Sequence, residues 1–493
     1  MLKIDDLMSS SGVKFGTSGA RGRVADMTDR VCFAYTLGFL KHLRARGALV
    51  AGGDVGIAGD YRPSSPRIMA ACAAAVRAEG LRARNFGRVP TPALAAFGIA
   101  ERMPTLMVTG SHIPDDRNGI KFNLPTGEIL KDDETAIRAQ TVVLPEDAFS
   151  GDGSLLAPAL PAAESAAFDA YVERYLRFFP ADFLAGLRVG VYEHSSVARD
   201  AFHAVLTGLG AEVTRLGRAE TFIPVDTEAI RPEDVELAAG WAAAGRFDAL
   251  VSADGDGDRP LVSDAEGRWL RGDIAGILCA RELGAAAVVT PVSSNTALER
   301  SGWFKQVLRT RIGSPHVIAG MQQLRARGLA PVVGYEANGG FLIETDIERD
   351  GRRLPALPTR DAVIVALALL GAARRRGIPV AALADELPAR FTCSDRIKDF
   401  PTELSQAHLA AFATGDAAAD RDAAAGLFSG AFGPVADVDH TDGVRITFAS
   451  GEIAHLRPSG NAPELRAYTE AASAERACEM TRICLEILDD WRR

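Results

Sequence analysis

The chain has 493 residues, a length that predicts roughly three or four domains, and its 47% hydrophobic and 24% charged residues are ordinary for a soluble globular protein. Its net charge of −9 argues against nucleic acid or an anionic membrane as the main partner. The longest apolar stretch, residues 362–373, is too short to cross a bilayer and predicts a buried helix instead.

The cysteines and the N-terminus indicate a cytoplasmic protein. The six cysteines are scattered and form no C-x-x-C pair, which predicts free thiols in a reducing compartment. Residues 1–6 carry acid where a signal peptide needs basic residues followed by an apolar run. No feature of the sequence indicates an obligate protein partner.

The first candidate binding element along the chain is the glycine-rich segment 16–22, which includes Arg21. Exposed backbone N–H groups and one guanidinium can hold an anion. The segment matches neither a P-loop nor the G-x-G-x-x-G motif, so on its own it identifies no ligand.

A plan of strand, serine pair, helix and strand occurs three times, over residues 55–87, 187–217 and 286–313. We expect the serines to cap the helices that follow them. After each copy comes an apolar strand that enters a polar, glycine-rich loop. The repeat therefore predicts three α/β domains of similar build, each with one loop beyond the carboxyl end of a strand, where ligands of α/β sheets bind.

The first of these loops places Ser111 and His112 directly after the apolar strand 106–109. A serine hydroxyl needs activation to act as a nucleophile, and Lys121 nearby could move a proton. No G-x-S-x-G elbow surrounds the serine, so an esterase triad is disfavoured. The competing interpretations are a capping serine and a solvated surface lysine.

The second loop carries three carboxylates at alternate positions, Asp254, Asp256 and Asp258, separated by glycines. Such oxygens suit a hard cation such as Mg²⁺ or Ca²⁺. A calcium EF-hand is excluded because its sixth position would be Arg259 and its twelfth Ala265. Arg259 instead suits a site that also holds phosphate. A solvated turn is the alternative.

The third loop, residues 336–340, includes Glu336 and Asn338 and follows an apolar strand over residues 332–335. From about residue 386 the pattern changes. A strand over 444–448, a Pro/Gly loop and an amphipathic helix over 473–491 predict a smaller α+β domain.

The loop in this last region has the composition of a phosphate clamp, with a polar turn as the alternative. Arginines, a hydroxyl, an amide and a glycine backbone can together meet the oxygens of a phosphoryl group. The residues are Arg457, Ser459, Gly460, Asn461 and Arg466.

Two further segments are predicted to be irregular: 145–162 as an interdomain linker and 414–434 as an exposed segment. The predicted domains are residues 1–155, 156–267, 268–385 and 386–493.

Together, and in this order, the four loops resemble those of the α-D-phosphohexomutase superfamily of phosphoglucomutases and phosphomannomutases, over residues 13–470. The resemblance implies a fold of three related α/β domains, with mixed sheets sandwiched by helices, and a smaller C-terminal α+β domain around a central cleft. The C-terminal domain would close over the cleft.

The resemblance also implies roles for the residues. Ser111 resembles the phosphorylated serine, and Asp254, Asp256 and Asp258 resemble the Mg²⁺ ligands, with the serine phosphate as a further ligand. Glu336 and Asn338 match the sugar-recognition loop. The phosphate-binding loop is matched by Arg457, Ser459, Gly460, Asn461 and Arg466. The catalytic set is Ser111, His112, Lys121, Arg21 and Arg259.

The sequence departs from the family pattern in three places. Ile113 stands where Asn is usual after Ser-His, and Asn338 stands in a Glu-x-Ser-Gly motif where Ser is usual. Asn461 and Ala462 stand where Thr and Glu are usual. The second departure bears on substrate identity, and the third bears on hydrogen bonding to phosphate.

The expected activity is that of a phosphomannomutase, which interconverts mannose 6-phosphate and mannose 1-phosphate, with glucose phosphates as second substrates. The reaction would run through a phosphoserine and a hexose 1,6-bisphosphate intermediate. Phosphoglucosamine mutase and phosphoglucomutase are the alternatives within the family. A phosphomonoesterase is disfavoured because the sequence offers no second cluster of metal ligands, and a non-catalytic sugar-phosphate sensor is disfavoured by the intact serine and aspartates.

Overall fold

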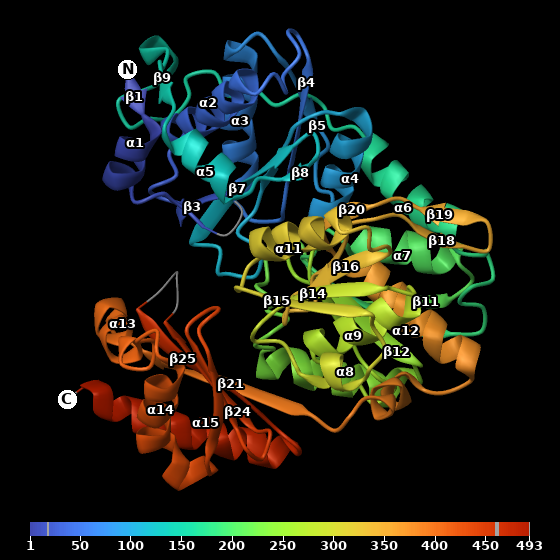
Figure 1. The fold of residues 1–493 in the computed structure, drawn as a ribbon. Coiled ribbons are helices and arrows are strands. Elements are labelled where there is room, and N and C mark those ends of the chain that lie inside the picture. Colours follow the sequence, from blue (N-terminus) through green and yellow to red (C-terminus); the bar gives the residue numbers. More distant parts are fainter. Residues whose placement is uncertain (17–18, 459–462, 493) are drawn as a thin grey trace.

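The computed structural model describes residues 1–16, 19–458 and 463–492 (Figure 1). Four main sheets follow one another along the chain, and the C-terminal sheet stands to one side of the other three (Figure 1). Within the described residues, no helix combines the length and the apolar character that crossing a membrane requires. All six cysteines are free thiols.

The first sheet has the strand order β2-β3-β7-β6-β4-β5. Its strands are β2 (Lys14–Phe15), β3 (Gly19–Arg23), β4 (Asp54–Gly59), β5 (Arg82–Asn85), β6 (Thr105–Val108) and β7 (Arg117–Leu124). The helices of this part are α1 (Ile4–Ser11), α2 (Asp29–Ala45), α3 (Ser65–Ala78), α4 (Thr91–Glu101) and α5 (Lys131–Arg138). The short strand β8 (Gly127–Glu128) pairs with β7, and β1 (Leu2–Lys3) pairs with β9 (Thr141–Val142).

The second sheet has the order β11-β10-β12-β13, and the third β15-β14-β16-β17-β20. The second consists of β10 (Arg188–His194), β11 (Glu212–Arg218), β12 (Ala249–Ala253) and β13 (Pro260–Val262), with α6 (Ala166–Phe178), α7 (Arg199–Gly208) and α8 (Pro232–Gly245). The strands of the third are β14 (Ala287–Pro291), β15 (Gln306–Thr310), β16 (Val332–Tyr335), β17 (Phe341–Ile343) and β20 (Leu357–Asp361). Its helices are α9 (Gly272–Glu282), α10 (Ala297–Arg300), α11 (Ser314–Ala326) and α12 (Ala362–Arg376), and β18 (Ile347–Arg349) pairs with β19 (Arg352–Leu354).

These three sheets share one topology, which confirms the predicted repeat. In each, a first strand (β4, β10 or β14) lies parallel to the strand before it in the sheet and to the strand after it. A fourth strand (β7, β13 or β17) then returns antiparallel. The three predicted loops therefore occupy equivalent turns, at the carboxyl ends of β6, β12 and β16.

The prediction that the serine pairs cap their helices is wrong. None of the helices α3, α7 and α10 has a side-chain cap at its first turn. The hydroxyls bind within the loops instead, because polar groups in a buried turn need nearby partners. Ser65 Oγ donates to Asp60 at 2.6 Å, and Ser196 Oγ donates to the carbonyl oxygen of Asp254 at 2.7 Å.

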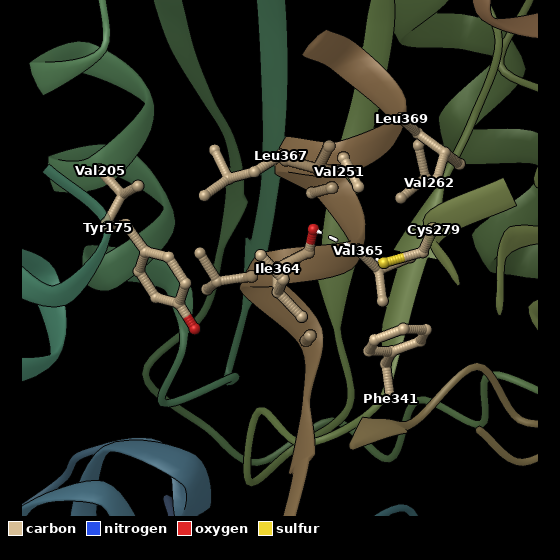
Figure 2. Close-up of a cluster of buried hydrophobic side chains, with 14 of the residues drawn as sticks. Tyr175, Val205, Val251, Val262, Cys279, Phe341, Ile364, Val365, Leu367 and Leu369 are labelled. Carbon is tan, nitrogen blue, oxygen red and sulfur yellow. Dashed lines mark hydrogen bonds between the residues drawn. The ribbon is translucent and has the colours of Figure 1, made fainter. Parts of the chain in front are cut away.

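The apolar stretch 362–373 forms the buried part of helix α12, as the sequence predicts. The Asp361 carboxylate accepts the backbone N–H of Val363 at the helix start, and Gly377 ends the helix in a left-handed conformation. Figure 2 shows Ile364 and Leu367 of this helix among side chains of α6, α7, β12 and α9. Helix α12 is buried on all sides because it lies between the second and third sheets.

One hydrophobic cluster extends from Ala58 in β4 to Leu383 and so joins parts of the first three sheets. A separate cluster, between Phe400 and Leu488, fills the C-terminal part. With each main sheet and its helices taken as one unit, the first three units all contribute to one shared core. The first unit also has a cluster of its own, between Ile4 and Phe149, and the C-terminal unit has a separate core. The exact boundaries of the four predicted domains stay a prediction.

The C-terminal sheet is antiparallel, with the order β21-β25-β24-β23-β22. Its strands are β21 (Phe391–Lys398), β22 (Val435–Asp439), β23 (Val444–Phe448), β24 (Ile453–Pro458) and β25 (Glu464–Ala471), and its helices are α13 (Thr402–Ala410), α14 (Ala417–Phe432) and α15 (Ala474–Asp489). The prediction of an irregular segment over 414–434 is wrong, because helix α14 occupies most of it. Its alanines favour helix, Asp416 caps it, and it buries Phe428 and Phe432.

Candidate active site

Ser111 lies in the turn between β6 and β7, with a positive φ of 57° and no exposed surface. Its backbone N–H donates to Thr109 Oγ1 at 2.8 Å, which fixes the turn. Its hydroxyl donates to Asp254 Oδ2 at 2.6 Å, and this hydrogen bond links the first unit to the second. The predicted serine and the predicted metal loop therefore meet directly.

The three aspartates of the second loop are fully buried, and one oxygen from each lies within 4.8 Å of the others. Asp254 Oδ1 accepts the backbone N–H groups of Asp258 and Arg259, at 3.1 and 3.2 Å. These bonds fold the loop back on itself. Gly257, with a φ of +74°, makes this tight turn possible.

Lys121 is buried, so the interpretation of a solvated lysine is excluded. From β7 its ammonium group donates to Asp256 Oδ2 at 2.6 Å and to Asp258 Oδ2 at 2.7 Å. Thr91 Oγ1 also donates to Asp256 Oδ2, at 2.5 Å. These contacts orient the two carboxylates and leave their other oxygens free.

The donor set fits a hard divalent cation. The Oδ1 atoms of Asp256 and Asp258 are buried and have no hydrogen-bond partner among the described residues. Buried carboxylate oxygens without a partner are costly, and a metal ion is the group that three converging carboxylates can hold. The structure therefore supports the predicted cation site at Asp254, Asp256 and Asp258.

Burial and neighbouring charges shift the pKa values in the aspartate loop. Burial, together with Asp256 and Asp258, raises the pKa of Asp254 well above its usual range. Burial also acts to raise the pKa of Asp258, but Arg360 and Lys121 outweigh it and lower that pKa. Lys121 keeps its charge because the two aspartates raise its pKa against the effect of burial. The site thus pairs buried charges of both signs.

His112 stands beside Arg259, whose Nη1 donates to His112 Nδ1 at 2.7 Å. Burial and the Arg259 charge lower the pKa of His112 to about 3. The imidazole is therefore neutral near pH 7 and accepts a hydrogen bond on Nδ1, which lies 3.4 Å from Ser111 Oγ. Asp226 lies 3.9 Å from His112 Nε2 and had no signal in the sequence.

The predicted anion loop at residues 16–22 is largely part of strand β3, which pairs antiparallel with β2, and Arg21 in β3 lies opposite Gly119 of β7. Thr17 and Ser18 lie outside the described residues. Burial and the Arg259 charge lower the pKa of Arg21 to about 10, and the aspartate loop counters this effect. Arg21 therefore lies within electrostatic range of the aspartate loop, as expected of a basic residue of the site.

The third loop presents Glu336 and Asn338, both nearly buried, in the turn between β16 and β17. Asn338 Oδ1 accepts the backbone N–H of Gly340 at 3.0 Å, and its carbonyl accepts Thr227 Oγ1 at 2.8 Å. The Asn338 side chain thus shapes its own loop. Glu336 instead faces Arg360 of β20, whose Nη1 donates to Glu336 Oε2 at 3.0 Å.

Arg360 is the main residue that the sequence analysis missed. It lies within a strand and before a buried helix, with no glycine-rich loop to mark it. Its Nη2 lies 2.9 Å from Asp258 Oδ2, so the side chain links the second loop to the third. Only the fold brings together residues this far apart in the sequence.

Of the predicted phosphate clamp, Arg457 and Arg466 lie opposite each other on β24 and β25. Arg396 of β21 pairs with Arg466 from the other side, so three arginines cross three adjacent strands. Arg457 lies 3.0 Å from the Asp442 carboxylate, and Arg466 lies 3.1 Å from Glu464. The predicted residues Ser459, Gly460 and Asn461 lie outside the described residues.

A cavity of about 900 Å³ connects these groups. Residues from all four units line it: His112 from the first, Arg259 from the second, Glu336, Asn338 and Arg360 from the third, and Arg396, Arg457 and Arg466 from the fourth. The lining therefore offers arginines from the second, third and fourth units together with carboxylates such as Glu336. A small molecule with hydroxyl and anionic groups suits such a lining.

Three family models match the chain. They describe phosphoglucomutase/phosphomannomutase α/β/α domain I over residues 12–143, α/β/α domain III over 271–391 and the C-terminal domain over 403–485. Together they cover more than half of the chain. The first match includes the serine loop, the second includes the glutamate loop, and the third includes Arg457 and Arg466.

Relatives and solved structures agree with these matches. A phosphomannomutase of Salmonella muenchen is 44% identical over 482 residues, covering 97% of this chain and 96% of its own. A phosphoglucomutase/phosphomannomutase family protein of Burkholderia thailandensis has the same fold, with a TM-score of 0.71, 22% identity and coverage of 100% and 98%. An N-acetylphosphoglucosamine mutase of Aspergillus fumigatus, solved with GlcNAc-6P and magnesium, has a TM-score of 0.56, 14% identity and coverage of 99% and 98%.

The matches to the family models and the full-length similarity agree with the geometry of the site, in which a buried serine, an aspartate loop and a carboxylate loop surround one cavity. The chain belongs to the phosphoglucomutase/phosphomannomutase family of phosphohexomutases.

Proposed function

We propose that the protein is a phosphomannomutase, which interconverts mannose 6-phosphate and mannose 1-phosphate and also accepts glucose phosphates. The contact that carries the proposal is the hydrogen bond of 2.6 Å from Ser111 Oγ to Asp254 Oδ2. It places a hydroxyl that can take a phosphoryl group beside three carboxylates that can bind a cation. The 44% identity to a phosphomannomutase supports mannose as the sugar.

In the proposed reaction, phosphorylated Ser111 donates its phosphoryl group to the free hydroxyl of the sugar phosphate, which gives a hexose 1,6-bisphosphate. The intermediate turns around in the cavity, and its other phosphate returns to Ser111. Arg259 and Arg21 would hold charge on the phosphoryl oxygens. The neutral His112, whose Nδ1 lies 3.4 Å from Ser111 Oγ, and Lys121 would move or hold a proton at the reacting hydroxyls.

We assign Mg²⁺ to the three aspartates, with the phosphate on Ser111 as a further ligand. Mg²⁺ bound there would offset negative charge on the moving phosphoryl group. The free Oδ1 atoms of Asp256 and Asp258 support this assignment, as does the magnesium in the structure of the Aspergillus fumigatus relative. Full activity after chelation, with elemental analysis finding no retained metal, would contradict it.

Glu336 would accept hydrogen bonds from sugar hydroxyls through the oxygen that Arg360 leaves free, and Asn338 would keep the loop in shape. Arg457, Arg466 and the neighbouring residues Ser459, Gly460 and Asn461 would hold the phosphate that is not reacting. Because the intermediate must present both ends in turn, this clamp must accept either phosphate of the bisphosphate.

One coupled assay with mannose, glucose and glucosamine phosphates, with release of inorganic phosphate measured in parallel, tests the proposal. We expect the highest kcat/KM with mannose 1-phosphate and no phosphate release. A clear preference for glucosamine phosphate would favour the phosphoglucosamine mutase. Steady phosphate release without isomerisation would favour a phosphomonoesterase, and binding without either reaction would leave a sensor.

A further inference from the structure

Arg360 spans two functional loops with one rigid group. Its guanidinium Nε and Nη2 atoms lie 3.1 and 2.9 Å from Asp258 Oδ2, and its Nη1 lies 3.0 Å from Glu336 Oε2. The side chain is only 3% exposed, at the wall of the cavity. A Cβ atom on Gly340 would lie 2.5 Å from Arg360 Cδ, so this last glycine of the third loop leaves the space that the arginine fills.

Each carboxylate that Arg360 contacts has one oxygen engaged and one left for a ligand. Asp258 Oδ2 accepts from Arg360 and from Lys121, while Asp258 Oδ1 has no hydrogen-bond partner among the described residues and lies 3.7 Å from Arg259 Nε. Glu336 Oε2 accepts from Arg360. A planar guanidinium fixes the carboxylate planes that it contacts, and a carboxylate plane fixes where its free oxygen points.

We propose that Arg360 is a positioning residue that couples cation binding at Asp258 to sugar binding at Glu336. Because the one planar guanidinium orients both carboxylates, a shift of the Asp258 or Glu336 carboxylate also shifts the other. This inference rests on the proposed function for the role of Glu336, while its cation half depends only on the aspartate loop. Arg360 itself acts through these two carboxylates.

A purely structural role makes a different prediction. If Arg360 only neutralised buried charge, its loss would lower the stability of the protein, and a change at Glu336 would leave the cation affinity unaltered. Coupling instead requires that a change at Glu336, which lies outside the aspartate loop, alters cation affinity. It also requires that Arg360 and Glu336 substitutions combine non-additively.

The first experiment measures Mn²⁺ affinity of the purified full-length protein by the electron paramagnetic resonance of free Mn²⁺. We expect Arg360→Gln to weaken Mn²⁺ binding by roughly tenfold or more, as loss of a group that orients a metal ligand does. Arg360→Lys keeps the charge but cannot span both carboxylates, so a smaller loss is expected. Arg199→Gln removes another buried arginine, one that binds the carbonyls of His194 and Ala219, and should leave Mn²⁺ affinity unchanged.

The second experiment is a double-mutant cycle of Glu336→Gln and Arg360→Gln, or Arg360→Lys if the glutamine variant does not fold. Glu336→Gln alone should weaken Mn²⁺ binding measurably, and the double variant should lose less kcat/KM than the product of the single losses. Mn²⁺ affinity of Arg360→Gln and Arg360→Lys within about twofold of the wild type, or losses that multiply within about twofold, would overturn the coupling.

The two proposals fail in different ways. A wild-type protein without mutase activity would overturn the proposed function, yet the Mn²⁺ titrations need no turnover and would still decide the cation half. An active wild type with unchanged Mn²⁺ affinity in every Arg360 variant would overturn the inference and leave the mutase intact.

Discussion

At the scale of single residues, the site depends on a few buried polar atoms whose partners come from other parts of the chain. The Ser111 hydroxyl donates to Asp254 of the second unit, and Thr109 accepts the Ser111 backbone N–H and so holds the turn. The residue has a positive φ that is uncommon for serine. Backbone strain of this kind is typical of positions where side-chain direction matters for function.

Ser111→Ala should lower mutase turnover by about three orders of magnitude or more while leaving the fold intact, because the proposed phosphoryl acceptor is lost. Turnover would be measured with mannose 1-phosphate and the fold by circular dichroism. The protein should be made in cells that lack the wild-type gene. Near-normal turnover of such a preparation would remove the phosphoserine mechanism.

Glu336→Ala should damage sugar recognition more than it damages cation binding. A carboxylate that accepts hydroxyl hydrogen bonds contributes about 1.5–3 kcal/mol for each charge-assisted bond, so kcat/KM should fall roughly tenfold or more. The check is a comparison of kcat/KM for mannose and glucose phosphates with Mn²⁺ affinity. Unchanged kinetics for every hexose phosphate would leave Glu336 a structural role.

His455 in the C-terminal core should make stability depend on pH. Burial, with help from Arg445 and Arg457, lowers its pKa to about 4, from 6.5. The unfolded chain therefore takes up a proton first, so the stability is fully present above pH 6.5 and is lost as pH falls toward 4. At 1.36 kcal/mol per pH unit the loss amounts to about 3 kcal/mol.

The variant His455→Gln tests this expectation, because glutamine can donate to the Asp442 carbonyl, as His455 Nε2 does at 2.6 Å, but does not titrate. Urea unfolding of both proteins between pH 7 and pH 4.5 would measure the difference. We expect a shallower loss of stability in the variant. Parallel pH profiles for the two proteins would show that another group dominates acid unfolding.

At the scale of elements, the repeated strand-to-strand turn explains how three loops converge. Each loop follows the third strand of the repeated motif, and the equivalent turns after β6, β12 and β16 bring polar groups to one cavity. The aspartate loop has little room at Gly257. A Cβ on Gly257 would lie 2.8 Å from the Cβ of Ala198, in addition to its φ of +74°.

Gly257→Ala should therefore distort the aspartate loop and weaken Mn²⁺ binding as well as stability. Gly284→Ala is a matched control, because Gly284 has a similar φ of +69° but nothing within 4 Å of an added Cβ. The control should cost only the backbone strain of about 1 kcal/mol. Mn²⁺ titrations and thermal unfolding of both variants make the comparison, and equal effects would contradict a steric role for Ala198.

The same scale explains what the sequence could and could not predict. Ser111 and the aspartates were found because a polar, glycine-flanked loop directly after an apolar strand is a local signal. Arg360, Asp226 and Arg396 have no such signal, because their partners lie far away in the chain and two of them sit within strands. Helix α14 was missed because glycines and aspartates interrupt its alanines, and tertiary packing of Phe428 and Phe432 outweighs them.

At the scale of the whole molecule, the C-terminal unit is the part that can move. Its core is separate, and hydrogen bonds join it to the third unit. Ile312 N–H donates to Asp442 Oδ2 at 2.9 Å, Arg311 Nε donates to the Thr441 carbonyl at 3.0 Å, and Thr296 N–H donates to Glu470 at 3.0 Å. Polar contacts of this kind can exchange with water at little cost.

We expect residues from about 386 onward to rotate as a body toward the other units when a sugar phosphate binds, with the hinge near residues 383–391. Arg457→Ala should reduce both this closure and kcat/KM, because the clamp would no longer hold the substrate phosphate. Paired distance labels on the first and last units would measure the motion. Identical distances with and without saturating mannose 1-phosphate would count decisively against it.

The continuous core from Ala58 to Leu383 determines which parts of the chain should unfold together. Helix α12, near the end of this region, is buried from Ala362 to Ala373 against helices and strands of the second unit. A fragment that ends at residue 267 would expose apolar surface of the second unit that α12 normally covers. Limited proteolysis should therefore yield two resistant fragments, with the cut near residue 390. Calorimetry should resolve two unfolding transitions. Four transitions would mean that each unit unfolds independently.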